Sequence, residues 1–280
     1  MIKVKNTDLI QVDQEKCTQC GLCIAVCRGV LSMGDDGLEV IRSVCIGCGQ
    51  CVAICPQSAL DNAKSPLIKQ MPLKEMPVLD AATAAQFLRS RRSIRDYHQR
   101  SVPREKVLQL LDIARMAPTA CNSQGIAYHV VTNSDTLRAI ATVVTQWAEG
   151  ELNRDSAMAA SPWAPNSAAQ IEIYHQTSED IVLRSAPCFI VAIADKNSPA
   201  PVRDNAYLSL AYAQLFATSI GLGTCWAGLF EYCAASGYEP LLNLLDMPAD
   251  MRVISGLMVG YPKYTYQRLV DRNPLQVTWQ

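Results

Sequence analysis

Two cysteine-rich runs, CTQCGLCIAVC at Cys17–Cys27 and CIGCGQCVAIC at Cys45–Cys55, decide the fold of the amino-terminal part of this chain. Each run has the spacing C-x2-C-x2-C-x3-C, the bacterial ligand pattern for cubane iron–sulfur clusters. Gly21 and Gly49 follow the second cysteine of each run. A glycine there lets main-chain N–H groups approach the sulfides without a Cβ in the way. The doubled spacing therefore predicts two [4Fe-4S] clusters.

Residues 1–60 resemble the two-cluster ferredoxin family. In that family the fourth cysteine of each run ligates the cluster of the other half. The resemblance implies one cluster on Cys17, Cys20, Cys23 and Cys55. It implies a second cluster on Cys45, Cys48, Cys51 and Cys27. Pro56 follows the last cysteine as the family pattern requires, but Arg28 stands where the first half would carry its proline and adds positive charge near a cluster.

A disulfide framework and a zinc site are two other possible uses of these cysteines. Disulfide frameworks suit small secreted chains, and the amino terminus MIKVKNTDLIQVD is too polar for a signal peptide. Zinc sites use four ligands, typically as two C-x2-C pairs, and leave the doubled pattern unexplained. Cysteine ligands of this kind favour a reducing, cytoplasmic location. The other cysteines are expected to be small buried hydrophobes, and they are Cys121, Cys188, Cys225 and Cys233.

The composition limits the possible classes of function. The chain has 280 residues, of which 49% are hydrophobic and 18% charged, with a net charge of −1. It can build a sizeable core, it has no electrostatic basis for nucleic-acid binding, and no apolar run approaches the ~20 residues that span a bilayer. We expect a cluster domain at 1–60, a proline-containing linker at 61–80 and a second domain at 81–280.

The second domain alternates helical and strand patterns. Thr83 and Gln86 fit a capping box and open a helix to Arg89. Asp204 is expected to cap a helix that ends at Gly221 and is apolar nearly all round, which implies burial. The other expected helices are 103–116, 135–144, a helical excursion at 145–180, and 236–246. The expected strands are 128–132, 186–194, one after Gly221, and 252–259.

Three arginines and a serine lie together at residues 91–95, directly after a helix end. Arginine binds phosphate through a bidentate fork, and serine adds a short hydroxyl donor. The segment is therefore either an anion cradle or a solvated basic patch. No G-x-G-x-x-G follows a strand and no P-loop is present, so neither of these nucleotide sites is supported.

Four short stretches, taken in order, resemble the FMN-dependent nitroreductase family. They are RRSIRDY from Arg91, APTACNSQ from Ala117, GLGTCWAG from Gly221 and VGYP from Val259. The resemblance covers about 81–280 and implies an α+β fold, in which a mixed, mainly antiparallel sheet is surrounded by helices and preceded by a small bacterial-ferredoxin-like domain. It also implies a homodimer that binds FMN in its interface.

The resemblance assigns the flavin-binding residues. The FMN phosphate and ribityl chain are expected on Arg91, Arg92, Ser93 and Arg95. The edge of the flavin ring is expected to contact Pro118, Thr119, Asn122 and Gln124, contributed by the second subunit. Main-chain amides at Ala227 and Gly228 are expected near flavin N5, although many members carry glutamate where this chain has Ala227. Arg272, or else Arg268, is expected to close on the phosphate. No side chain is assigned as catalytic.

The predicted function is an iron–sulfur flavoprotein oxidoreductase. Electrons pass between the two clusters and FMN and reduce a small organic acceptor of nitroaromatic, quinone or enone type. The donor is a ferredoxin-type protein or NAD(P)H, and the direction of flow is open. A different flavin reaction, such as dehalogenation or azoline oxidation, is a further alternative. So is an electron-transfer subunit whose FMN relays electrons to a protein partner. Trp147, Trp163 and Tyr174 in 145–180 either set specificity or pack this excursion onto the domain.

Overall fold

The computed structural model describes residues 9–27, 29–42, 44–73 and 79–280. Arg28 lies outside the described residues, as do residues 74–78 of the expected linker. Contacts divide the chain into two compact units. The first is Met1–Val78 with Cys121–Ser123, and the second is Leu79–Ala120 with Gln124–Gln280. Within the described parts, no helix has the length and apolar character needed to cross a membrane.

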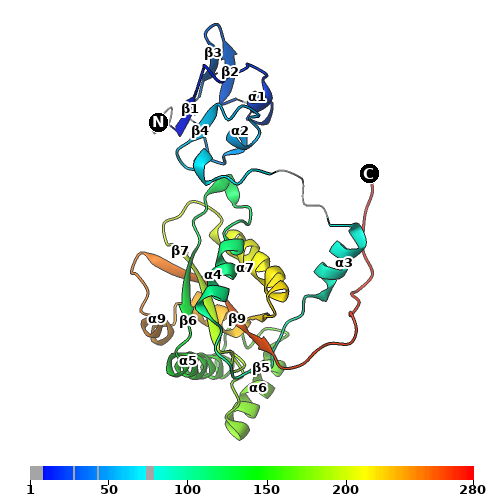
Figure 1. Cartoon of the computed structure of the whole chain (residues 1–280). Helices are drawn as coiled ribbons and strands as arrows, with labels where there is room; N and C mark the ends of the chain where they lie inside the picture. Colours follow the sequence, from blue (N-terminus) through cyan, green and yellow to red (C-terminus); the bar gives the residue numbers. More distant parts are fainter. Residues whose placement is uncertain (1–8, 28, 43, 74–78) are drawn as a thin grey trace. The chain divides into compact units, whose positions relative to one another are not determined.

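The first unit is built from two short antiparallel strand pairs and two one-turn helices (Figure 1). Strand β1, Ile10–Val12, pairs with β4, Leu60–Asn62. Strands β2, Leu31–Gly34, and β3, Gly37–Val40, form an antiparallel hairpin about MGDDG at 33–37, a sequence with the residue types of a turn. Helices α1, Leu22–Val26, and α2, Gln50–Ala53, each begin one residue before the third cysteine of a run and contain it. The apolar core is small and includes Cys23 and Cys51 themselves.

Both short helices of the first unit begin at a left-handed glycine. Gly21 caps α1 with φ 77° and Gly49 caps α2 with φ 72°. A Cβ on Gly49 would also approach the Ser65 side chain to 2.7 Å. These positions favour glycine because a side chain is strained in the left-handed region. The repeated turn holds the second and third cysteines of each run on one tight loop.

The second unit is organised around one antiparallel sheet of strands β5, β6, β7, β8 and β9 (Figure 1). The longest strand, β9 at Met251–Pro262, pairs with β7, Cys188–Asp195. It also pairs with β8, Gly223–Trp226, and with β5, Tyr97–His98. Strand β6, Ala127–Val131, adds to the other side of β7. The expected α+β fold is confirmed.

Helices cover both faces of this sheet, which explains why β7 is a continuous apolar run. Cys188, Ile190 and Ala192 share a core with helices α4, Arg104–Ala114, and α7, Val202–Ser219. Phe189, Val191 and Ile193 point the opposite way. Their core includes residues of α5, Ser134–Leu152, α8, Gly228–Ala235, and α9, Glu239–Leu245.

Three expectations about helices need correction. Helix α3, Ala81–Ser90, is capped by Asp80, whose carboxylate accepts from the N–H groups of Ala82 and Thr83. The expectation of an N-cap at Thr83 is therefore wrong. The N-cap lies three residues earlier, because the Asp80 carboxylate accepts from both of these N–H groups. Pro201, and not Asp204, is the N-cap of α7, and Asp204 lies in the first turn. Helix α8 was not expected at all.

The region 145–180 is helical, as expected. It contains the second half of α5 and the separate helix α6, Ala164–Thr177. Trp147 is buried in the core, which agrees with a packing role. Trp163 is 67% exposed. A short 3-10 turn, η2 at Leu67–Lys69, lies within the residues expected to form the linker.

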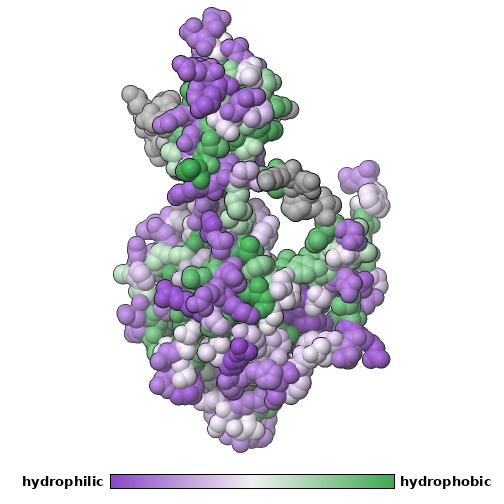
Figure 2. Space-filling view, in the orientation of Figure 1, coloured by the Kyte–Doolittle hydropathy of each residue, from purple (hydrophilic) through white to green (hydrophobic). Residues whose placement is uncertain are grey.

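Several apolar side chains remain on the surface of the second unit. They lie on α4 (Leu108), α7 (Leu208 and Tyr212) and α3 (Leu88). Figure 2 shows such side chains gathered over the region of α4 and α7, so α7 is not buried on every side. Among the cysteines outside the two runs, Cys188, Cys225 and Cys233 are buried as expected. Cys121 is exposed, so the expectation of a buried thiol is wrong there.

Candidate cluster and flavin sites

The four cysteines expected to hold the first cluster line one small cavity. Cys17, Cys20 and Cys23 reach it from the first run, and Cys55 reaches it from the end of the second. Burial raises the pKa of the Cys23 thiol, and the nearby Cys17 and Cys55 add to the rise. The fourth cysteine of the second run therefore lies with the first three of the other run. This is the exchange that the ferredoxin pattern implies.

The second set shows the reciprocal exchange. Burial raises the pKa of the Cys51 thiol to about 11, and charge on Cys27, Cys45 and Cys48 contributes in the same direction. Burial is also the main cause that raises the pKa of Cys27, and negative charge on Cys45 and Cys48 raises it further. Thiols of this kind bind metal only as thiolates, so cluster loading would release protons and would weaken as the pH falls.

N–H groups donate to the sulfur atoms of two of these cysteines, Cys45 and Cys55. The Gly47 N–H donates to Cys45 Sγ at 3.4 Å, and the Ala59 N–H donates to Cys55 Sγ at 3.3 Å. The amide of Asn62 donates to Cys45 Sγ at 3.7 Å. Asn62 is 1% exposed, and its side-chain oxygen accepts from the N–H groups of Lys64 and Ser65. Sequence reasoning missed Asn62 because it follows the cysteine runs, in residues expected to be a linker.

The donor set fits a cluster better than a single ion. Among the described residues, no three Cys, His, Asp or Glu side chains lie close enough together to hold one metal ion. A cubane cluster needs wider spacing, because each thiolate binds a different iron atom. The eight cysteines form two sets that exchange one member each, and N–H groups donate to two of the sulfur atoms. Both features suit clusters of this kind.

The segment Arg91–Arg95, which is expected to bind the FMN phosphate, lies along β8 and is called the flavin cradle below. The Ile94 N–H donates to the Thr224 carbonyl at 2.9 Å, and Ser93 forms an isolated parallel bridge with Thr224. A Cβ on Gly223 would come within 2.5 Å of the Ile94 side chain. Glycine at this point lets the segment from Arg91 to Arg95 approach the strand closely.

Charged and polar groups of the cradle meet around one buried thiol. Burial raises the pKa of Cys225, and four neighbours act against that rise. In order of effect they are Arg95, Ser93, Arg184 and Arg91. Arg91 also donates to Gln214 on α7 at 3.4 Å, and Gln214 is 3% exposed. Arg184 was not identified from the sequence, since a lone arginine before an apolar strand gives no signal.

Arg92 points to the carboxyl-terminal tail. Its guanidinium lies over the ring of Tyr266 at 5.0 Å from the centroid. Arg268, two residues further along, and Arg272 are both exposed. Within the described part of the chain, neither has a side-chain hydrogen bond or ion pair. The structure thus brings the tail to Arg92 at Tyr266, and it pairs neither Arg268 nor Arg272 with the cradle.

The remaining expected flavin contacts fall in different places. Thr119 and Gln124 line a groove of about 840 Å³ beside α4, and Thr119 Oγ1 accepts from the Gln124 N–H. Asn122 lies in Cys121–Ser123, which groups with the first unit. The Ala227 N–H donates to the Gly256 carbonyl, so it is already used within the sheet and does not point to a flavin. The N–H groups of residues 228–230, at the start of α8, precede its first intrahelical hydrogen bond and can face an anion.

Comparison with known proteins identifies both parts of the chain. The nitroreductase family model matches residues 88–261, more than half of the chain, and a 4Fe-4S dicluster domain model matches residues 9–64. The chain therefore belongs to the nitroreductase family, and it is an FMN-dependent oxidoreductase that carries a 4Fe-4S ferredoxin-type domain. The expected family and class of enzyme are confirmed.

Individual relatives are distant. A Methanothermobacter thermautotrophicus protein named "Putative NADH dehydrogenase/NAD(P)H nitroreductase" is 27% identical over 193 residues, which cover 68% of this chain and 80% of that one. A Bacteroides fragilis nitroreductase solved with bound FMN has a TM-score of 0.53 at 16% identity, covering 70% of this chain and 98% of its own. A Desulfitobacterium hafniense nitroreductase with bound FMN has a TM-score of 0.53 at 20% identity, covering 69% and 97%. At these identities the structures establish the fold alone.

Proposed function

We propose that this protein is a cytoplasmic iron–sulfur flavoprotein that carries two [4Fe-4S] clusters and one FMN per chain. Electrons pass between the clusters and FMN and reduce a small organic acceptor of nitroaromatic, quinone or enone type. The donor is a ferredoxin-type protein or NAD(P)H. The exchange of Cys27 and Cys55 between the two cysteine sets is the observation that carries the proposal.

The exchange of cysteines supports iron–sulfur clusters over metal sites that are each built from one run alone. Each proposed cluster takes three ligands from one run and one from the other. Two independent zinc sites would each take ligands from one half. The N–H donors on Cys45 and Cys55 further stabilise negative charge on sulfur. These clusters supply one-electron transfer and FMN links it to two-electron chemistry.

The cradle on β8 supports the flavin site. Arg91, Ser93 and Arg95 converge near Cys225, where their charges and hydroxyl suit a phosphate ester. Arg184 adds a cation that we include in this site. Free N–H groups at the start of α8 suit the electron-rich edge of a reduced flavin. The proposed roles of Arg92, and of Arg272 or else Arg268, follow the family pattern. The contact of Arg92 with Tyr266 supports a part for the tail that carries both of the other arginines.

We further propose that the protein acts as a homodimer. The apolar side chains left exposed on α4 and α7 are those a second copy would cover. Pro118, Thr119, Asn122 and Gln124 would then reach the flavin of the other subunit, as in the family. The cluster domain would end after β4 and η2, and the flavin domain would begin near α3.

The test is the cofactor content of protein purified without oxygen. We expect about eight irons, about eight sulfides and one FMN per chain. Adding NADH, NADPH or reduced ferredoxin in turn identifies the donor that bleaches the flavin. Nitrobenzene, a quinone and an enone are then offered to the reduced protein. Oxidation of the flavin by none of them, but by a redox protein, would replace the enzyme proposal with the electron-transfer alternative.

A variant pair locates the flavin. Arg91→Ala removes one cation of the cradle and its hydrogen bond to Gln214, and it should lose most of the bound FMN while iron stays unchanged. Arg104→Ala removes an exposed arginine from the start of α4 and should change neither. Full flavin in Arg91→Ala would show that the cradle is misplaced. Iron content below that of the Arg104→Ala control would show that the two sites are not independent.

A further inference from the structure

A second cavity, separate from the residues assigned to the flavin, lies in the second unit. Its volume is about 780 Å³, within the usual range of small-molecule pockets. It lies among residues of α7, α8, α9 and β9. Its apolar wall includes Met247 and Val253, and its charged lining side chains are Lys196, Arg203, Glu231 and Arg252.

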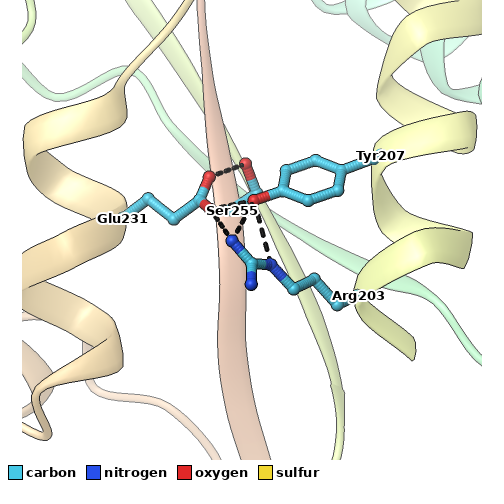
Figure 3. Close-up of polar contacts among 4 residues, drawn as sticks. All are labelled: Arg203, Tyr207, Glu231 and Ser255. Atoms are coloured by element: carbon cyan, nitrogen blue, oxygen red, sulfur yellow. Dashed lines mark hydrogen bonds and ion pairs between the residues drawn. The ribbon is translucent and has the colours of Figure 1, made fainter. Parts of the chain in front are cut away.

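One side of the cavity is a fixed polar network (Figure 3). Glu231 on α8 accepts from Tyr207 and Arg203 on α7 and from Ser255 on β9. The Arg203 guanidinium also donates to the Tyr207 hydroxyl at 3.1 and 3.2 Å. Burial, and then the hydrogen bond to Glu231, raises the pKa of Tyr207, so the phenol stays protonated and donating at neutral pH. The network holds Arg203 at the edge of the cavity and satisfies the Glu231 carboxylate.

The other two basic side chains of the cavity, Lys196 and Arg252, differ in their hydrogen-bond partners. Lys196 Nζ donates to the Ala249 carbonyl at 2.9 Å. Arg252 lies on β9 opposite Ala194 and, within the described parts of the chain, has no hydrogen-bond or ion-pair partner. The cavity therefore presents three basic side chains and one acidic side chain, of which the acidic one is already fully paired. The charge that remains to be balanced is positive.

We propose that this cavity binds a small organic anion, a monocarboxylate with an apolar or aromatic body. The carboxylate pairs with the fork of Arg252, since arginine binds planar oxyanions bidentately. The apolar body lies against Met247 and Val253. An organic cation is disfavoured, because Glu231 is satisfied by three donors and the remaining charges would repel it.

Such a ligand would contact the helix that begins at Gly228. Glu231 lies one turn into α8, and its N–H donates to the Ala227 carbonyl. Binding in this cavity needs none of the residues of the flavin cradle and does not require that the proposed acceptor chemistry is correct. The two proposals can therefore fail separately.

The experiment titrates benzoate and its neutral analogue benzamide into the intact protein with its cofactors bound, followed by saturation-transfer NMR. Benzoate should bind about tenfold tighter than benzamide, the difference typical of a charge-assisted hydrogen bond. Arg252→Gln should weaken benzoate about tenfold and leave benzamide unchanged. Arg252→Lys should fall between, because it keeps the charge but loses the fork. Arg104→Gln, an exposed arginine outside the cavity, should change nothing.

A second readout does not depend on how the Arg252 variants fold. In protein labelled at the methionine methyl carbons, the Met247 signal, assigned with Met247→Leu, should shift as benzoate is added. Equal affinities for benzoate and benzamide would overturn the proposal. So would an unchanged benzoate affinity in Arg252→Gln, an equal loss in Arg104→Gln, or a Met247 signal that does not move.

Discussion

The cluster unit and the flavin cradle assemble their proposed ligands in opposite ways. The cluster unit draws eight cysteines from 39 consecutive positions, 17 to 55, and its two halves exchange one ligand each. The cradle draws Arg91 and Arg95, Arg184, Gln214 and Cys225 from separate parts of the second unit. The first site exists because of local spacing, and the second exists only because a sheet brings distant segments together.

This difference implies different sources of stability. The first unit has a small apolar core in which two of the cysteines take part, so its folding should depend on the bound metal. The second unit buries both faces of its sheet, with side chains such as Phe189 and Ile190 fully covered. Its folding should not depend on any cofactor. Substitutions in the two units should therefore have separable effects on iron and flavin content.

The largest effect is expected for Cys51→Ala. This change removes a proposed ligand that is also buried in the small core, so one cluster should be lost and the iron content should fall to about four per chain or below. The flavin content should be unchanged. Iron, sulfide and flavin analyses on the same sample measure this. Cys233→Ala is the matched control, because it removes a buried thiol of the second unit and should leave iron intact. Equal iron in the two variants would contradict the ligand assignment.

A smaller effect is expected for Gly223→Ala, which should weaken flavin binding and leave the iron content unchanged. The added Cβ would lie 2.5 Å from Ile94 and 2.8 Å from Pro262, so the Arg91–Arg95 segment must move away from β8. Overpacking of this kind costs about 1–3 kcal/mol. Flavin affinity should fall while iron stays constant, and thermal unfolding of the second unit should shift down. Gly150→Ala in α5 is the control. A Cβ added there would have no neighbouring atom within 4 Å, so this change should stabilise the second unit by about 1 kcal/mol. A Gly223→Ala protein that bound flavin normally would show that the close approach to β8 is not needed.

The smallest effect is expected for Asn62→Asp. The aspartate keeps an oxygen for the N–H groups of Lys64 and Ser65 but no longer donates to Cys45 Sγ. A lost hydrogen bond of about 1 kcal/mol corresponds to about 40 mV for one electron. The added negative charge acts in the same direction, so the potential of the cluster on Cys45 should fall.

A redox titration followed by electron paramagnetic resonance measures this shift for each cluster. The cluster assigned to Cys17 and Cys55 should keep its potential, which makes it the internal control. A shift of both clusters by the same amount would mean that Asn62 acts through the whole unit and not through Cys45.

The sequence predicted these two regions unequally, for physical reasons. The cysteine spacing, the hairpin at 33–37 and the doubly buried strand β7 were all predictable, because each depends on neighbours in the sequence. Arg184 and Gln214 were not predictable, because only the tertiary fold brings them to Arg91 and Cys225. Helix α8, GLFEYCAA, was missed because a short apolar run does not distinguish a buried helix from a strand.

Local competition explains the remaining errors. Asp80 and Thr83 both have the chemistry of an N-cap, and the aspartate three residues earlier takes the free N–H groups. Cys121 was expected to be buried because its neighbours in sequence are apolar. It lies instead on a kinked turn with φ 49°, which leaves its side chain exposed.

The pairing of β1 with β4 also bears on how this chain could have originated. Ile10 lies opposite Asn62, so the first and last strands described in the first unit are neighbours in one strand pair. A module whose entry and exit are adjacent can be added to another gene, or removed from it, without parting the elements between them. The dicluster match ends at residue 64 and the nitroreductase match starts at residue 88, with neither interrupting the other. Gene fusion can join such a module to another chain, and protein engineers can exchange the module in the same way.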